Sequence, residues 1–405
     1  MKLNCGITRV AVAVLCAASW SAASRAADTL EQAVRESDFL FDLRVRYEGV
    51  GQDGMPEDAE ALTSRLRAGF QTAPLKKTAL LVEGVWTEDL VDDYNSTTNG
   101  ETEFPVVADP ADFAAINRFA IINKSLEHAT LTFGRQRIVL DDSRFVGNVG
   151  WRQNEQTFDA LRAQVGSGKL KADLSYVDQV NRVFGPDSPV GRWHGDVVLA
   201  NVTQTLPIGT LTYFEYFIDL DDAVTQSSNT LGARLAGSKK LGTIGGTYVL
   251  SYAHQADAGQ NPVTYTDDYY LLEGGLNFAR IGVGLGYEVL GSNGAASFQT
   301  PLATLHIFQG WADKFLTTPA AGIEDSYVKL SYPMGKRGAF TNISAVAYFH
   351  DFSAEQGSAH FGDELDLQLV ARTEKMVLTL KYADYRADQL FTDTDKLWLS
   401  VDYSF

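Results

Sequence analysis

Arginine is the residue that could do the most specific chemistry in this chain, and it recurs at alternate positions. Arg44 and Arg46 are separated by one apolar residue, and so are Arg65 and Arg67. A guanidinium is permanently charged, and its planar fork of donors matches a carboxylate. Two neighbouring strands that carry such pairs would form a basic ladder able to guide anionic solutes. Arg118 and Arg162 fall on the same polar phase of later segments.

Acidic residues share this polar phase and leave a second interpretation open. The set comprises Asp42, Glu48, Glu83, Asp173, Glu273, Glu288, Glu364 and Asp366. Arginines and acids on one face could form ion pairs that neutralise each other, without any preference for a solute. From the residues alone, the basic ladder and the neutralised wall are both possible.

Enzyme chemistry has little support in the sequence. The histidines at 128, 194, 254, 306, 350 and 360 are scattered, with neither the H-E-x-x-H helix pattern nor the G-x-S-x-G nucleophile motif. We therefore expect no enzyme, no cofactor and no metal site. A lipid-modifying enzyme of the outer membrane remains a weak alternative, because His254 or His350 beside a serine could face the lipid boundary.

A period of two dominates the segments that must position these residues. Phe39, Phe41, Leu43, Val45 and Tyr47 alternate with polar residues, so one face of a strand is apolar and the other polar. Runs of about 10 to 13 residues suit a tilted membrane strand, whereas soluble strands average about 5 to 6. The same pattern recurs near residues 62–70, 80–86, 170–176, 244–252, 270–278, 365–371 and 397–405.

Connections between these runs alternate between short turns and long polar loops, as in outer-membrane barrels. Counting gives about 19 candidate strands, but a closed single-chain barrel of this kind has an even number. We therefore expect the candidate at residues 302–308 not to cross. The sequence predicts an all-β fold, a closed antiparallel transmembrane β-barrel of about 18 strands. Long inserted loops are expected near residues 91–114, 139–156 and 291–322.

The start of the sequence predicts a cleaved signal peptide at residues 1–26, which leaves 27–405 as one barrel domain. Lys2 and Arg9 precede a short apolar run at 10–20, and Ser24 and Ala26 suit a cleavage site. Both cysteines, at positions 5 and 16, fall inside this signal, so no disulfide is expected in the mature chain. We expect export to the outer membrane, where lipid and lipopolysaccharide surround the barrel. The alternating segment 397–405, which ends in Phe405, is similar to the signal read by the barrel-assembly machinery.

The formal net charge of −17 argues against nucleic acid as a partner, because phosphate binding requires a basic surface.

Two blocks of sequence resemble the alginate-export porin family. The first comprises residues 133–137, 141–142, 144–147, 151–154 and 156–160, and the second comprises 306, 308–316, 318–319, 322, 325 and 327–328. The resemblance implies an 18-stranded outer-membrane channel whose inserted loops narrow the pore. It also implies that Arg135, Arg137, Arg144 and Arg152 line the pore or anchor a loop, and it places Trp311, Asp313 and Lys314 in an inserted loop.

Two points bear on those four arginines. They could instead only bind loop carboxylates such as Asp141 and Asp142. Arg135 and Arg137 also share the phase of the apolar Leu131 and Phe133, which requires either a bulge near Gly134 or a position above the lipid-facing band.

Together, these observations predict a passive outer-membrane porin of the alginate-export type, with an anionic saccharide or an organic acid as its solute. The pore-lining, substrate-guiding set is Arg44, Arg46, Arg65, Arg67, Arg118, Arg135, Arg137, Arg144, Arg152 and Arg162. A structural or adhesive barrel with a plugged lumen is the alternative from another class.

Overall fold

The computed structural model describes residues 26–107, 109 and 112–405. The expected signal peptide, apart from Ala26, and both cysteines fall outside the described residues. The described chain begins with a short helix, α1 (Leu30–Arg35), capped by the Thr29 side chain, which accepts a hydrogen bond from the backbone N–H of Gln32. None of the helices in the described part of the chain is both long enough and apolar enough to cross a bilayer.

Eighteen strands follow α1 and form one sheet. Their bounds are β1 (Asp38–Gln52), β2 (Ala59–Gln71), β3 (Thr78–Asp93), β4 (Phe113–Asn123), β5 (Ala129–Gln136), β6 (Thr157–Ser167), β7 (Leu170–Asn181), β8 (Arg192–Leu206), β9 (Gly209–Leu220), β10 (Ser228–Leu241), β11 (Ile244–Asp257), β12 (Thr266–Phe278), β13 (Ile281–Leu290), β14 (Ile323–Arg337), β15 (Phe340–Ser353), β16 (His360–Arg372), β17 (Met376–Ala387) and β18 (Thr394–Ser404).

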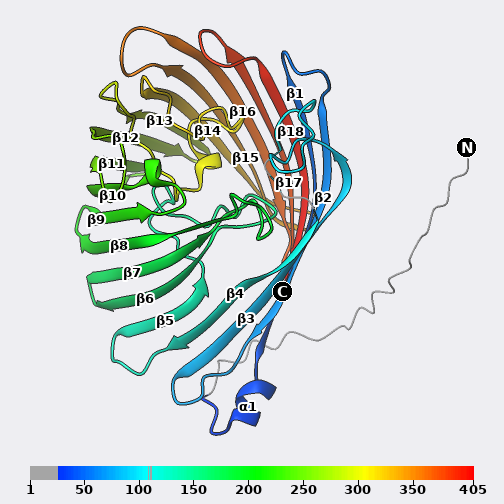
Figure 1. Ribbon diagram of the computed structural model, residues 1–405, viewed down its shortest axis with the longest axis vertical. Helices are drawn as coiled ribbons and strands as arrows, with labels where there is room; N and C mark the ends of the chain where they lie inside the picture. Colours follow the sequence, from blue (N-terminus) through cyan, green and yellow to red (C-terminus); the bar gives the residue numbers. More distant parts are fainter. Residues whose placement is uncertain (1–25, 108, 110–111) are drawn as a thin grey trace, which may run out of the picture.

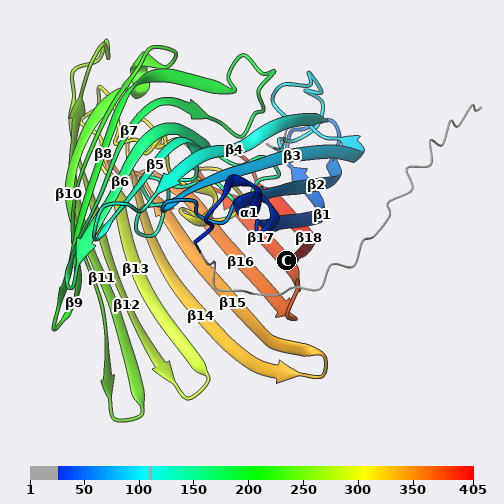
Figure 2. The same cartoon turned by 90° about the horizontal axis from the view of Figure 1, so that it is seen from below.

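The sheet closes into a barrel (Figures 1 and 2) because β1 pairs antiparallel with β2 on one edge and with β18 on the other. Every neighbouring pair is antiparallel and consecutive in sequence, apart from the closure that joins β1 to β18. The predicted fold class, a closed antiparallel barrel of about 18 strands, is confirmed.

The alternation in sequence sets the two faces of the wall. In β1, Leu43 and Val45 are each 37% exposed on the outside, whereas Arg46 between Val45 and Tyr47 is 1% exposed and turns inward. Lipid contact requires apolar side chains on the outer face, and charged side chains are tolerated where they face water or each other. The polar phase found in the sequence is therefore the inner face of the barrel.

The two ends of the barrel differ in the length of their connections. Turns such as 168–169, 207–208, 242–243 and 279–280 are short, whereas the connections at the other end include 94–112, 137–156 and 291–322. We call 137–156 the first inserted loop and 291–322 the second inserted loop. The prediction that residues 302–308 do not cross is confirmed, because they belong to the second inserted loop and contain only the 3₁₀ turn η2 (Leu305–Ile307).

Both inserted loops fold into the barrel and pack against its inner wall. The ring of Phe145, in the first loop, lies 4.9 Å from Phe214 of β9 and 5.2 Å from Tyr269 of β12, measured between ring centroids. Phe315, in the second loop, lies 4.6 Å from Phe352 of β15. The principal apolar cluster of the described chain therefore lies inside the barrel and joins loops to wall.

Candidate functional site in the barrel lumen

Arg44, Arg46, Arg65 and Arg67, the arginines of the expected basic ladder, lie on the inner face of β1 and β2. Arg44 lies directly opposite Arg65 in the register, and Asp42 lies opposite Arg67. Arg65 forms an ion pair with Asp42, and Arg44 forms one with Asp402 of β18 at 2.5 Å. Asp42 and Asp402 therefore neutralise part of the positive charge of the ladder.

The ladder holds the first inserted loop by its backbone. The guanidinium of Arg44 donates hydrogen bonds to the carbonyl oxygens of Gly150 and Trp151, at 3.2 Å and 2.9 Å. Arg46 donates to the same Trp151 oxygen and also forms an ion pair with Asp109. A guanidinium has five N–H donors, so it can bind a carboxylate and loop carbonyls together.

Glu155, in the first inserted loop, is the acid that several arginines share. Its carboxylate lies 2.6 Å from Arg137 and 3.5 Å from Arg67, and it accepts a hydrogen bond from Asn117 of β4 at 2.7 Å. Burial alone would raise the pKa of Glu155, but the charges of Arg67 and Arg137 and the hydrogen bonds hold it at about 2. Glu155 is thus ionised and fixes its loop beside the ladder.

Arg144, nearer the start of the first loop, reaches the wall at β13. Its side chain is almost completely buried and donates to Glu288 of β13 at 2.6 Å. It also donates to Thr300 and Gln309 of the second loop, at 3.0 Å and 3.2 Å. One guanidinium therefore joins both loops to the wall.

Asp313 and His306 form the centre of the second loop. Asp313 accepts from Arg152 of the first loop at 2.7 Å, and its other oxygen lies 2.8 Å from Nδ1 of His306. Burial lowers the pKa of His306 well below its ordinary value despite the attraction of Asp313, so the ring is neutral. With Nδ1–H donating to Asp313, Nε2 is free to accept from Lys381 of β17, whose Nζ lies 2.6 Å away.

Tryptophan rings surround the Lys381 ammonium. Its Nζ lies 4.4 Å from the Trp151 ring, 3.7 Å from Trp311 and 5.4 Å from Trp398, measured to ring centroids. These rings come from the first loop, the second loop and β18, respectively. A desolvated cation over aromatic faces is strongly held. This aromatic cage is the point where both loops and the wall meet.

The remaining predicted residues lie around this centre. Arg118 pairs with Glu83 at 2.6 Å, and Arg162 pairs with Asp173 at 2.5 Å. Lys314 donates to Thr394 at 2.9 Å, and burial together with Lys396 lowers the pKa of Lys314 to about 8. Trp311, Asp313 and Lys314 belong to the second inserted loop, as the resemblance implied.

Arg135 differs from the other predicted arginines because it points away from the lumen. It shares the outward phase with Phe133, which is 64% exposed, and it pairs with Asp159 at 2.7 Å. The β5 register runs without a shift through Gly134, so no bulge turns Arg135 inward. Of the two options open from the sequence, a position above the lipid-facing band is the one that applies.

Sequence reasoning missed most partners in this centre. Glu155, Asp109, His306 and Trp398 carry no local pattern that links them to the arginines. Trp398 and Lys381 do face each other across β17 and β18, so correct strand pairing would have placed them together.

Below the loops, the inner wall remains lined by accessible polar side chains. One cavity, near the 279–280 turn, is bordered by Glu273, Asn277, Tyr327 and Lys329. A second, near the 168–169 turn, is bordered by Asp141, Gln164, Lys171 and Asp173. The end of the barrel with the short turns is therefore a polar vestibule.

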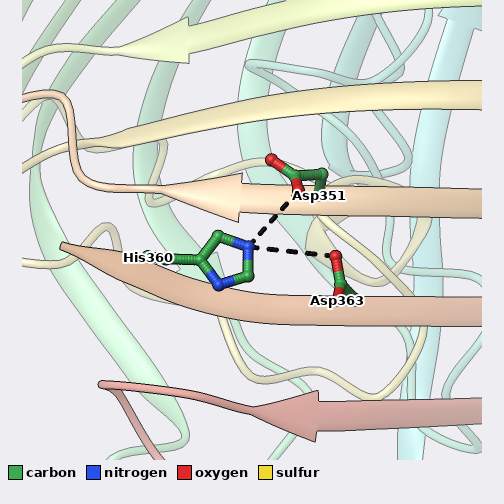
Figure 3. A group of neighbouring side chains, drawn as sticks. All are labelled: Asp351, His360 and Asp363. Carbon is green, nitrogen blue, oxygen red and sulfur yellow. Dashed lines mark hydrogen bonds and ion pairs between the residues drawn. The ribbon is translucent and has the colours of Figure 1, made fainter. Parts of the chain in front are cut away.

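A group of acids around His360 marks the outer end of β15 and β16 (Figure 3). His360 Nε2 lies 3.3 Å from Asp351 and 3.9 Å from Asp363, while Nδ1 lies 3.2 Å from Asp388. Because three carboxylates surround the two ring nitrogens, the protonated form of His360 can donate a hydrogen bond from each nitrogen and offset part of their negative charge. The two histidines named as enzyme candidates also pair with acids: His350 faces the lumen beside Asp325, and the more exposed His254 lies beside Asp268.

Comparisons with known proteins agree with this geometry. A family model described as alginate export matches residues 91–288, from within β3 to within β13. No curated protein gives a match to the chain. The structure of Pseudomonas aeruginosa OpdK with vanillate superposes with a TM-score of 0.69 at 12% identity, covering 92% of this chain and 99% of OpdK.

Other outer-membrane structures superpose equally well. Pseudomonas aeruginosa OccK8 (OprE) gives a TM-score of 0.70 at 15% identity, and Acinetobacter baumannii OccAB3 gives 0.70 at 13%. Each match covers 92% of this chain, and 99% and 100% of the respective relatives. The chain therefore has the 18-stranded barrel fold of the outer-membrane porins, and over residues 91–288 it matches the alginate-export family.

Proposed function

We propose that this protein is a passive outer-membrane channel for small anionic solutes, organic acids or short anionic saccharides. The observation that best supports this proposal is a closed barrel with a charged inner face, to which two inserted loops are attached inside the lumen. Solutes diffuse through the hydrated lumen, and the loops set a size limit. The apolar outer band suits contact with lipid, and we expect membrane lipid and lipopolysaccharide around it and insertion by the barrel-assembly machinery.

The distribution of charge supports a preference for anions. The arginines Arg44, Arg46, Arg65 and Arg67 lie together on β1 and β2, where Asp42 and Glu48 accompany them. A second group of inward acids, Glu288, Asp325, Glu364 and Asp366, lies on β13, β14 and β16. Among the described residues, buried N–H groups of Arg46, Arg65, Arg67 and Arg152 lack a protein acceptor, and buried carboxylate oxygens of Glu48, Glu364 and Asp366 lack a protein donor. Buried polar atoms need a partner, which water can supply. Vanillate, the ligand named for OpdK, is an aromatic carboxylate.

Planar-bilayer recordings across a salt gradient test the proposal. The reversal potential of the parent protein should indicate a modest preference for anions, because the ladder raises the local anion concentration. The quadruple variant R44A/R46A/R65A/R67A should lose that preference. R386A, which removes an exposed arginine from the outer face, is the matched control and should keep it. Cation preference in the parent protein would reject the anionic solute class.

A barrel with a plugged lumen is the second candidate, because both loops are tightly packed. Arg46 and Arg65 are only 1% and 2% exposed, and their guanidinium groups bind loop or wall atoms. Such a barrel would have a structural or adhesive role. Absence of single-channel conductance would favour it over the channel, and liposome swelling with sugars and uronates would identify the solute if conductance is present.

A further inference from the structure

The wall of the barrel has a break on one side. β4 and β5 pair only from Asn123↔Leu131 to Phe119↔Arg135, and β5 then ends at Gln136 where the chain turns into the lumen. The upper part of β4, from Phe113 to Arg118, pairs with β3 on one edge. Within the described residues, no strand pairs with its other edge. In Figure 1, β3 and β4 run away from the strands that follow them.

Side chains and loop residues fill this break, which we call the window. Its floor is Arg135, which donates to the free carbonyl oxygen of Ile116 at 3.2 Å while pairing with Asp159. Asn117 of β4 donates to Glu155 at 2.7 Å, and Asn154 donates to the carbonyl oxygen of Arg182 at 3.0 Å. An open sheet edge is tolerated near lipid only where its polar groups are satisfied.

A small cavity lies at the window. It is bordered on the outside by Ile116, which is 56% exposed, and by Arg192. It is bordered on the inside by Glu155, which contacts Arg67 of the lumen ladder. The separation between the outer surface and the lumen is therefore made of side chains, without a continuous backbone ladder.

The chemistry at the window suits an anionic amphiphile. Arg135, Arg182 and Arg192 border the cavity, and Arg182 lies flat against the Trp193 ring at 3.7 Å. On the outer face beneath it, Phe119 and Phe133 are exposed at the upper end of the apolar band. Guanidinium groups above an apolar surface match a charged head with an apolar tail.

We infer that the window is a lateral portal through which an anionic amphiphile passes between the outer leaflet and the lumen. Asn117, Arg135 and Glu155 form its closed state. Opening requires the Asn117–Glu155, Arg135–Ile116 and Asn154–Arg182 contacts to separate, and no strand pairing is lost. The inference rests on the proposed channel, because the portal needs a hydrated lumen behind it.

Cross-linking can lock the window in a chain whose two cysteines lie at positions 5 and 16, ahead of the barrel. We would place cysteines at Asn117 and Asn154, which both border this cavity, and join them with a short bis-methanethiosulfonate. The control joins V85C and A115C, which are register partners in the intact β3–β4 ladder beside the same cavity. Both proteins go into proteoliposomes that enclose albumin.

The probe is a dansyl-labelled dodecyl sulfonate added to the outer leaflet, whose transfer to the enclosed albumin is followed by fluorescence. A second measurement follows permeation of methanesulfonate, which is water-soluble. The locked window should slow transfer of the long sulfonate at least tenfold and leave methanesulfonate unchanged. The control cross-link should leave both unchanged. R182Q/R192Q, without cross-links, should slow only the long sulfonate.

Equal transfer of the long sulfonate in locked and unlocked proteins would overturn the portal. So would an equal loss of both probes, because it would mean a single route through the lumen. If methanesulfonate fails to permeate even the unmodified protein, the proposed channel itself is wrong, and this outcome is separate from the behaviour of the window.

Discussion

Asp313 accepts a hydrogen bond from Arg152 at 2.7 Å, and the two side chains, each at most 5% exposed, belong to different inserted loops. The loops are therefore fastened to each other as well as to the wall. Because Arg144 makes a similar bridge through Thr300 and Gln309, neither loop can leave the lumen without disturbing the other.

Replacing Arg152 should release the second inserted loop. In R152A, Asp313 keeps His306 and Lys396 as its ion-pair partners among the described residues. Removing one partner of a buried ion pair costs about 3 kcal/mol or more. We expect faster proteolysis within residues 291–322 and a larger single-channel conductance. R386A is the control, and unchanged proteolysis in R152A would contradict the bridging role.

Acid should loosen the first inserted loop through Glu155. The pKa of Glu155 is about 2 when the loop is docked and returns to about 4.5 when the loop is solvated. A lowered pKa stabilises docking above pH 4.5, and this stabilisation, about 3 kcal/mol, is lost as the pH falls from 4.5 towards 2. Conductance should therefore rise over this pH range.

The variant E155Q tests whether that rise belongs to Glu155. It should weaken docking already at neutral pH and remove the acid-dependent component, because its amide does not titrate. E101Q, at an exposed position in another loop, serves as the control. The same acid response in E155Q as in the parent would assign the effect to other carboxylates.

Lys381 should contribute to stability through the aromatic cage. K381M keeps much of the side-chain volume. It removes the positive charge that faces the three rings and the N–H donor that bonds to Nε2 of His306. Desolvated cation–π contacts are worth about 2 kcal/mol. We expect a lower temperature for loss of the heat-resistant folded form on gels, whereas K124M, in an exposed turn, should have no effect. An unchanged transition temperature would mean that the aromatic cage does not stabilise the folded barrel.

Gly310 lies so close to Glu364 that a larger residue would clash, and a comparison with Gly294 in the same loop separates this clash from backbone strain. The φ of Gly310 is +78°, and an added Cβ would lie 2.3 Å from Oε2 of Glu364. Gly294 has a φ of +84° with nothing within 4 Å. G294A should therefore cost only the backbone term of about 1 kcal/mol, and G310A should cost clearly more. Equal losses of loop protection against protease would contradict a close approach to Glu364.

The sequence was sufficient to predict the strands of the barrel wall but not the contacts inside the lumen. Period-two patterning and parity place the strand faces and exclude residues 302–308 as a strand, because lipid contact constrains every outward position in the same way. Arg135 shares the outward phase of Phe133, whereas the family resemblance implied that it lines the pore or anchors a loop. The pairing of Arg144 with Glu288 joins residues 144 positions apart, and nothing local in the sequence encodes it.

The pairing of β1 with β18 has a consequence for biogenesis. Asp42 pairs with Ser404 in this register, so the barrel closes only after the chain from β1 to β18 is available for pairing. Bringing such distant segments together is entropically costly and slow. Until then both terminal strands present bare hydrogen-bonding groups, which favour aggregation. Shortened chains that lack β18 should consequently be degraded in the periplasm.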